Sequence, residues 1–170
     1  MQITIDGKQE SLYGNPPEVG DQLPKFKLES DKHEWVKTAD IIGRITVLTT
    51  VPDINTPTCN IETKRFNQEA DMYPDARFIT VSNNTVDQQR NWCAAEGVAN
   101  LQLLSDEELS LGYAMKVYLP NDGELARTIF IIDQTGKIVY REIVADLSDE
   151  PDYAKALAAL NKIAQRRVDD

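Results

Sequence analysis

The segment ITVLTTVPDINTPTC, residues 45–59, is the most informative stretch for the fold of this chain. Residues 45–51 are apolar or β-branched and are followed by Pro52, which predicts a buried strand that ends at the proline. Thr56 is a favoured N-cap residue, and Pro57 suits the first helical position, where its missing N–H and fixed φ do no harm. We therefore expect a strand, a short turn and then a helix.

Cys59 falls at the third position of this predicted helix. In a capping box that position holds Glu or Gln, whose side chain reaches back to free backbone N–H groups. A thiolate at this position can be stabilised by the same N–H groups. An ordinary cysteine has a pKa of about 8.5, which a helix N-terminus or a nearby cation lowers to ~3.5–7.5. The alternative is that Cys59 packs as a small buried hydrophobe, as free cysteines often do. The strand, the proline, the threonines and the helix start together favour a reactive thiol.

The composition describes one globular domain spanning residues 1–170, of which 41% are hydrophobic and 27% are charged. A net charge of −10 argues against binding to nucleic acid or to an anionic membrane surface, because both need a cationic face. Residues 1–8 lack the basic and apolar regions of a signal peptide, and no later segment is apolar enough to span a bilayer. We therefore expect a cytoplasmic protein.

The chain has two cysteines, Cys59 and Cys93, and a single histidine, His33. In a reducing compartment, a disulfide between the two cysteines is expected to be transient and catalytic rather than a permanent structural link. These side chains are too few for a zinc site or for a nucleophile assisted by histidine, so we expect no metal site and place His33 at the surface.

The rest of the chain alternates between predicted strands and helices. The expected elements are an N-terminal hairpin with strand 2–5 and a turn at Asp6 and Gly7, strand 76–81, helix 86–96 closed by Gly97, strand 101–104, helix 107–115, a hairpin of 128–132 with 137–142, and a helix after Pro151. Strand–helix alternation followed by an antiparallel hairpin predicts an α/β protein with a central mixed sheet covered by helices on both faces, as in the thioredoxin-like fold.

Four motifs in order along the whole chain resemble the bacterial thiol peroxidases, which are atypical two-cysteine peroxiredoxins. Pro52, Thr56 and Cys59 reproduce the PxxxTxxC signature of peroxiredoxins. The other three segments are QRNWCAAEG at residues 89–97, which is similar to the helix of the resolving cysteine, LAR at 125–127, which is similar to the strand of the active-site arginine, and EPDY at 150–153.

The resemblance implies a role for each of five residues. Cys59 would be the peroxidatic nucleophile, and Thr56 would orient the peroxide through its hydroxyl. Arg127 would hold the thiolate and the polarised oxygens with its fixed set of donors. Pro52 would shield the pocket from water. Cys93 would condense with the sulfenic acid of Cys59 to give an intrachain disulfide, which protects Cys59 from irreversible oxidation.

The resemblance also implies the substrates and partners. Hydrogen peroxide and organic hydroperoxides would be reduced to water and alcohols, thioredoxin would reduce the disulfide, no cofactor would be bound, and the protein would be a homodimer. If both cysteines start in separate helices, we expect local unwinding around one or both of them before the disulfide closes.

Two other functions use the same cysteines. One is a redox sensor of the thioredoxin fold that binds a partner according to the oxidation state of Cys59 and Cys93. The other is a disulfide oxidoreductase, which usually has its cysteines at CxxC spacing, and this chain lacks that spacing.

Overall fold

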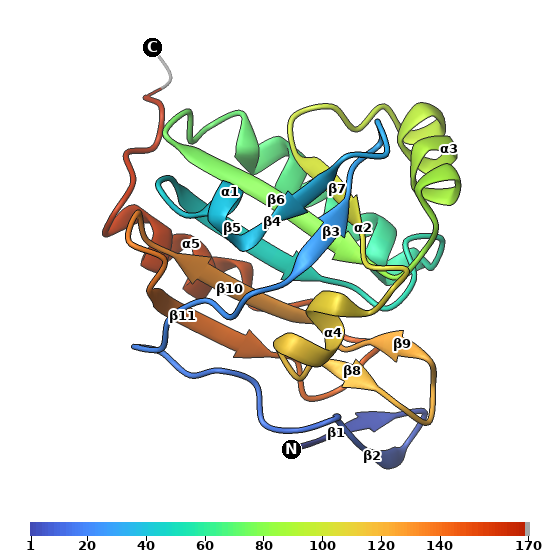
Figure 1. Ribbon diagram of the computed structural model, residues 1–170. Helices are drawn as coiled ribbons and strands as arrows, with labels where there is room; N and C mark the ends of the chain where they lie inside the picture. Colours follow the sequence, from blue (N-terminus) through green and yellow to red (C-terminus); the bar gives the residue numbers. More distant parts are fainter. Residues whose placement is uncertain (169–170) are drawn as a thin grey trace.

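A computed structural model describes residues 1–168 and shows a seven-stranded mixed sheet in the order β11-β10-β5-β6-β7-β3-β4 (Figure 1). Its strands are β3 (Lys27–Glu29), β4 (Trp35–Lys37), β5 (Ile45–Thr50), β6 (Ala76–Ser82), β7 (Gln102–Ser105), β10 (Thr128–Ile132) and β11 (Ile138–Ile143). β5, β6 and β7 run parallel, whereas β10 is antiparallel to both β5 and β11. The mixed sheet predicted from the sequence is therefore confirmed.

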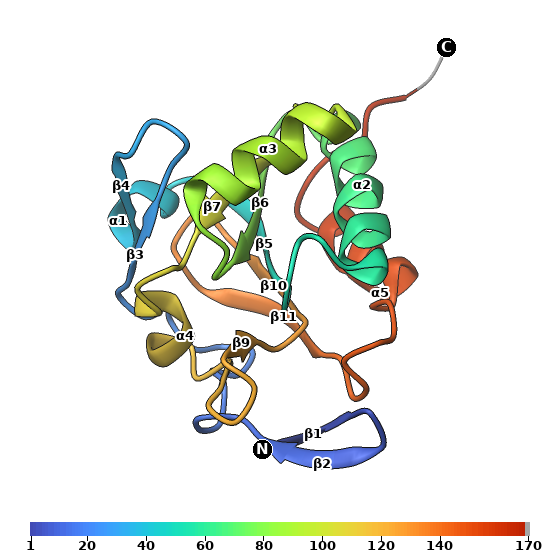
Figure 2. The same cartoon turned by 90° about the vertical axis from the view of Figure 1, so that its right-hand side faces the viewer.

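Helices cover both faces of this sheet (Figure 2). They are α1 (Thr38–Ile41), α2 (Pro57–Ala70), α3 (Val86–Glu96), α4 (Ser110–Ala114) and α5 (Tyr153–Asn161). The strand β5 is buried throughout and alternates between two cores: Leu48 packs with α1 and α4 residues, and Val47 packs with α2 and α5 residues. Period-two alternation in a fully buried strand thus separates the two hydrophobic layers.

Most of the predicted boundaries agree with the structure to within a residue or two. Helix α3 runs from Val86 to Glu96 as predicted, and Gly97 ends it in the left-handed conformation (φ 68°). The N-terminal hairpin consists of β1 (Gln2–Ile5) and β2 (Lys8–Ser11). It attaches to the chain just after β11 through hydrogen bonds between Thr4 and the backbone of residues 145 and 147.

The helix predicted over residues 107–115 is wrong at its start, because α4 begins only at Ser110. Leu109 adopts a left-handed conformation (φ 63°), which breaks the helical path before it. The carboxylate of Asp106 accepts the backbone N–H groups of Leu111 and Gly112 at 2.9 and 2.8 Å. A buried acceptor upstream therefore fixes the first turn of α4 and leaves the preceding residues as a turn.

Three strand pairings were not predicted: β3 with β4, β3 with β7, and β8 (Tyr118–Leu119) with β9 (Glu124–Leu125). β3 and β4 extend the sheet at one edge, and their short, largely exposed sequences give no clear period-two signal. The two-residue strands β8 and β9 form a separate hairpin that leads directly into Arg127. Within residues 1–168, no helix is long and apolar enough to cross a membrane.

Candidate active site

Cys59 lies at the third position of α2, as the sequence predicts, and its side chain is fully buried. It packs in a small cluster with Val51, Ile54 and Trp92. The buried face of α2 consists of Cys59, Glu62, Thr63 and Phe66. This spacing of three, four and seven residues is the repeat by which an amphipathic helix contacts a core. The sulfur therefore points into the protein rather than into solvent.

The turn between β5 and α2 is held by side-chain bonds. Asn84, at the end of the neighbouring parallel strand, accepts the N–H of Ile54 at 3.0 Å and donates to a carboxylate oxygen of Asp53 at 3.1 Å. Thr56 occupies the N-cap position, but its side chain makes no capping bond. Its hydroxyl donates instead to the carbonyl of Asp53 at 2.8 Å. The predicted N-cap position is right, but the hydroxyl of Thr56 bonds back to the turn and not to the first turn of α2.

Arg127 is 2% exposed and reaches the buried sulfur. Its Nη1 lies 3.4 Å from the Sγ of Cys59. Its Nε and Nη2 both donate to the backbone carbonyl of Leu147, at 3.1 and 2.8 Å. A guanidinium has a rigid, planar arrangement of donors, so two bonds to one carbonyl fix the orientation of the third nitrogen toward the sulfur. The side chains of Cys59 and Arg127 and the backbone carbonyl of Leu147 thus meet at one point.

Glu62 is a buried acid that the sequence analysis did not single out. Its Oε1 lies 3.5 Å from Nη1 of Arg127, and its Oε2 has no hydrogen-bond partner among residues 1–168. Burial raises the pKa of Glu62 to about 8, and Arg127 only partly offsets that rise. The signal in the sequence was its position three residues after Cys59, which places both side chains on one face of a helix.

A pocket of about 320 Å³ opens beside Arg127. Pro52, Thr56 and Arg127 line it together with Thr58, Leu147 and Ser148. Cys59 lies behind this wall with no exposed surface, in contact with Arg127. The structure therefore brings four of the five residues predicted for the site to one place.

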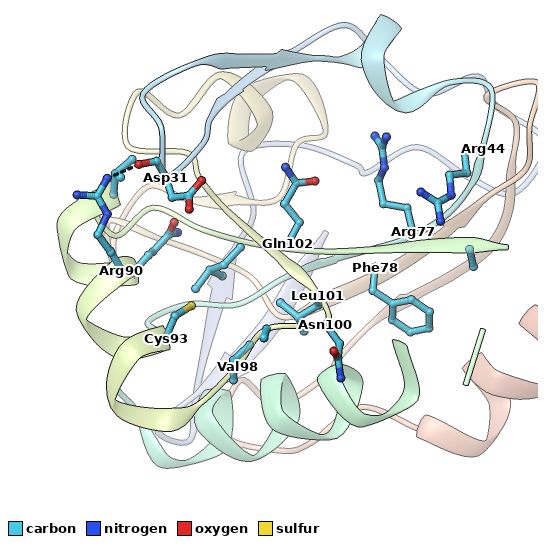
Figure 3. Close-up of a pocket in the computed structure, with 15 residues that line it drawn as sticks. Asp31, Arg44, Arg77, Phe78, Arg90, Cys93, Val98, Asn100, Leu101 and Gln102 are labelled. Carbon is cyan, nitrogen blue, oxygen red and sulfur yellow. Dashed lines mark hydrogen bonds between the residues drawn. The ribbon is translucent and has the colours of Figure 1, made fainter. Parts of the chain in front are cut away.

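Cys93 does not share this pocket. It lies on α3, half-buried, in a separate groove of about 510 Å³, with Arg90 near it and Arg44 and Arg77 at the other end (Figure 3). Burial, and then the nearby carboxylate of Asp31, raise the pKa of the Cys93 thiol. Both cysteines are free thiols here, and Cys93 packs against the outside of the cluster that contains Cys59. Trp92 is thus part of the cluster around Cys59, whereas Cys93 packs at the edge of that cluster and lines the separate groove.

The single histidine lies at the surface, as predicted. Its side chain is 58% exposed and its Nδ1 lies 3.7 Å from a carboxylate oxygen of Glu29. His33 is not among the residues that line the pocket beside Arg127 or pack around Cys59.

Comparison with solved structures supports the fold. The chain is similar to a peroxiredoxin-like protein from Aquifex aeolicus, with a TM-score of 0.87 at 25% identity over 95% of this chain and 96% of that one. It superimposes equally well on a thiol peroxidase from Chromobacterium violaceum, with a TM-score of 0.86 at 17% identity and the same coverage. These likenesses confirm the predicted thioredoxin-like peroxiredoxin fold.

Sequence comparison gives closer relatives. The chain is 34% identical to a thiol peroxidase of Bacillus subtilis over 96% of its own length and 99% of the relative's. It is 36% identical to a thiol peroxidase of Listeria monocytogenes, over 95% of this chain and 98% of that one. The AhpC/TSA family matches residues 19–141. The chain therefore belongs to the AhpC/TSA family, within which it is a peroxiredoxin enzyme of the thiol peroxidase kind.

Proposed function

We propose that this enzyme reduces hydrogen peroxide and organic hydroperoxides with Cys59 as its nucleophile and Cys93 as its resolving thiol. The contact between Arg127 and Cys59 is the observation that supports this assignment most directly, because it places a buried cation 3.4 Å from the sulfur. A cation at that distance, away from water, stabilises the thiolate and also the negative charge that develops on the peroxide oxygens.

The first step is attack of the Cys59 thiolate on one peroxide oxygen. The S–O bond forms as the O–O bond breaks, and the leaving oxygen takes a proton to become water or an alcohol. Thr56 assists as an acceptor, because its hydroxyl proton is already donated to the carbonyl of Asp53 and its lone pairs remain for the O–H of the peroxide. Pro52, which lines the pocket and carries no N–H, limits the access of water.

The charge of Glu62 determines how strongly Arg127 stabilises a negative charge on the sulfur of Cys59. A pKa of about 8 keeps Glu62 mostly neutral at pH 7. A neutral Glu62 leaves the positive charge of Arg127 to the Cys59 thiolate, whereas an ionised Glu62 would compete for it at 3.5 Å. We therefore assign Glu62 as a positioning residue that acts through Arg127.

The second half of the cycle uses Cys93. The sulfenic acid of Cys59 condenses with the Cys93 thiol, releasing water and forming an intrachain disulfide. Thioredoxin then supplies two electrons through thiol–disulfide exchange, which returns both cysteines to the thiol form. Cys93 is the half-buried sulfur and Cys59 the fully buried one, which supports attack of the reductant on Cys93.

A product map after one equivalent of hydroperoxide tests the roles of the cysteines. The reduced protein is expected to consume the peroxide and form a disulfide between Cys59 and Cys93, as seen by peptide mass spectrometry. The Cys93→Ser variant should consume one equivalent and trap a sulfenic acid at Cys59, whereas Cys59→Ser should consume none. Unreacted Cys59 thiol in the wild-type protein would contradict the assignment and favour a redox sensor without peroxidase chemistry.

Disulfide formation is expected to unwind part of α2 or α3, because Cys93 faces a groove separate from the pocket beside Cys59. Hydrogen–deuterium exchange measured by mass spectrometry should show faster amide exchange in residues 57–62, in residues 86–96, or in both after oxidation. The Cys93→Ser variant, treated with the same peroxide, is the control and should keep its protection in α3. Unchanged or slower exchange in both helices of the oxidised wild type would count against the unwinding.

The pH dependence of stability tests the state of Glu62. Its folded pKa is raised from 4.5 to about 8, so the folded state binds the extra proton between these values. The stability from this proton is complete below about pH 4.5 and is lost as the pH rises through about 8. Glu62→Gln lacks this loss, so its free energy of unfolding should gain on that of the wild type from pH 5 to pH 8. Urea titrations at each pH measure this.

Two comparisons make that measurement decisive. Glu107→Gln makes the same acid-to-amide change at an exposed position. The difference between its free energy of unfolding and that of the wild type should stay constant from pH 5 to pH 8. In the second comparison, the rate of peroxide loss above pH 8 should fall less in Glu62→Gln than in the wild type, because the variant cannot place a second anion beside Arg127. Parallel stability curves for Glu62→Gln and the wild type would refute the neutral Glu62.

A further inference from the structure

Three acidic residues line the pocket beside Arg127. Asp6 lies in the turn between β1 and β2, Asp122 lies in the loop between β8 and β9, and Glu124 lies in β9. We refer to these three side chains as the acidic rim. They come from separate segments, and the N-terminal hairpin contributes one of them because it is attached beside Leu147. The fold therefore brings negative charge from separate segments to this pocket.

No cation neutralises the acidic rim within residues 1–168. None of its three carboxylates takes part in an ion pair or accepts a side-chain hydrogen bond there. Among the residues that the structure describes, Arg127 is the only cation that lines the pocket, and its donors are directed at Cys59, Glu62 and the carbonyl of Leu147.

Neighbouring carboxylates add to this negative field. Burial is the largest cause that raises the pKa of Asp122, and the nearby acids Glu10 and Asp6 raise it further. Burial, and then Asp53 and Asp122, raise the pKa of Glu124. Burial is the larger cause of both shifts, and the smaller part that comes from neighbouring carboxylates reflects a negative field at this pocket, which also acts on a charged ligand.

We propose that the acidic rim makes this active site select neutral hydroperoxides and reject those that carry a carboxylate or another anionic group. This inference rests on the proposed function and names the substrate class of that site. Hydrogen peroxide and simple alkyl hydroperoxides are uncharged and enter without electrostatic cost. An anionic hydroperoxide must bring its charge past the rim to place its O–O bond near Cys59, and charged clefts change association rates by about 10- to 1,000-fold.

A matched pair of substrates isolates the charge. Cumene hydroperoxide with a carboxylate in the para position is compared with its methyl ester, which has the same reacting group and no charge. The second-order rate constant for peroxide loss is measured with reduced enzyme at pH 7.5 in single turnover, so that no reductant is needed. At low ionic strength the ester should react at least ~10-fold faster than the acid, and this ratio should fall several-fold in 0.5 M salt because the charges are screened.

A triple variant tests whether the rim is responsible. Asp6→Asn, Asp122→Asn and Glu124→Gln together should lower the ester-to-acid ratio by at least ~3-fold at low salt, because three charges are removed at the entrance. The circular dichroism spectrum and melting temperature establish that the variant is folded. If it does not fold, the ratio and its salt dependence in the wild type decide the question.

A control variant separates the rim from the net charge of the chain. Glu34→Gln, Asp75→Asn and Glu107→Gln remove the same three charges from exposed positions that do not line the pocket, and should leave the ratio near the wild-type value. A wild-type ratio near one at low salt, or equal effects of the two triple variants, would overturn the proposal. Failure of both substrates to react, with Cys59 left as a thiol, would instead overturn the proposed function itself.

Discussion

The site depends on a buried guanidinium that contacts a buried sulfur. A charged side chain with 2% exposure is unfavourable unless its donors are satisfied, and Arg127 meets this requirement with the carbonyl of Leu147, the carboxyl of Glu62 and the sulfur of Cys59. Cys59 and Glu62 belong to α2, and Leu147 belongs to the chain after β11. The position of Arg127 therefore requires that α2, the start of β10 and the chain after β11 all be in place. The same contacts of Arg127 therefore hold these segments together and place its charge beside Cys59.

That requirement explains why the N-terminal hairpin matters to a site whose other residues lie much later in the sequence, between positions 52 and 148. The backbone of Thr4 bonds to residues 145 and 147, and this same stretch presents the Leu147 carbonyl to Arg127. The hairpin turn also carries Asp6 to the pocket. A short two-stranded ribbon thus supports the orientation of the cation from outside and contributes to the charge that a substrate meets on entry. Behind the pocket wall, burial raises the pKa of Glu62 to about 8, which favours the neutral acid beside Arg127 at pH 7.

The sequence predicted the parts of the fold that local chemistry determines. Thr56, Pro57 and Cys59 took their predicted positions because an N-cap residue followed by proline restricts where a helix can begin. Gly97 ended α3 as predicted because a left-handed residue is needed there. The start of α4 was missed because it depends on Asp106, whose burial is a tertiary property. Glu62 was missed for the same reason, since an acid on a helix ordinarily faces solvent. The sequence predicted that Cys59 and Cys93 lie on separate helices, but not that Cys93 lines a groove of its own, because a helix boundary does not determine which face of the helix packs inward.

The central claim is that the charge of Arg127 acts on Cys59 during the reaction with peroxide. Its most direct test is the second-order rate constant for oxidation of Cys59, followed by stopped flow in a Cys93→Ser background, with Arg127 intact or changed to Gln or Lys. We expect a loss of about 10²- to 10³-fold for a folded Arg127→Gln protein, because a preorganised charge is removed from the transition state. Arg127→Lys should lie between the two, because an ammonium keeps the charge but cannot reproduce the planar pair of bonds to Leu147. A folded Arg127→Gln protein that reacts within twofold of the intact one would contradict the account.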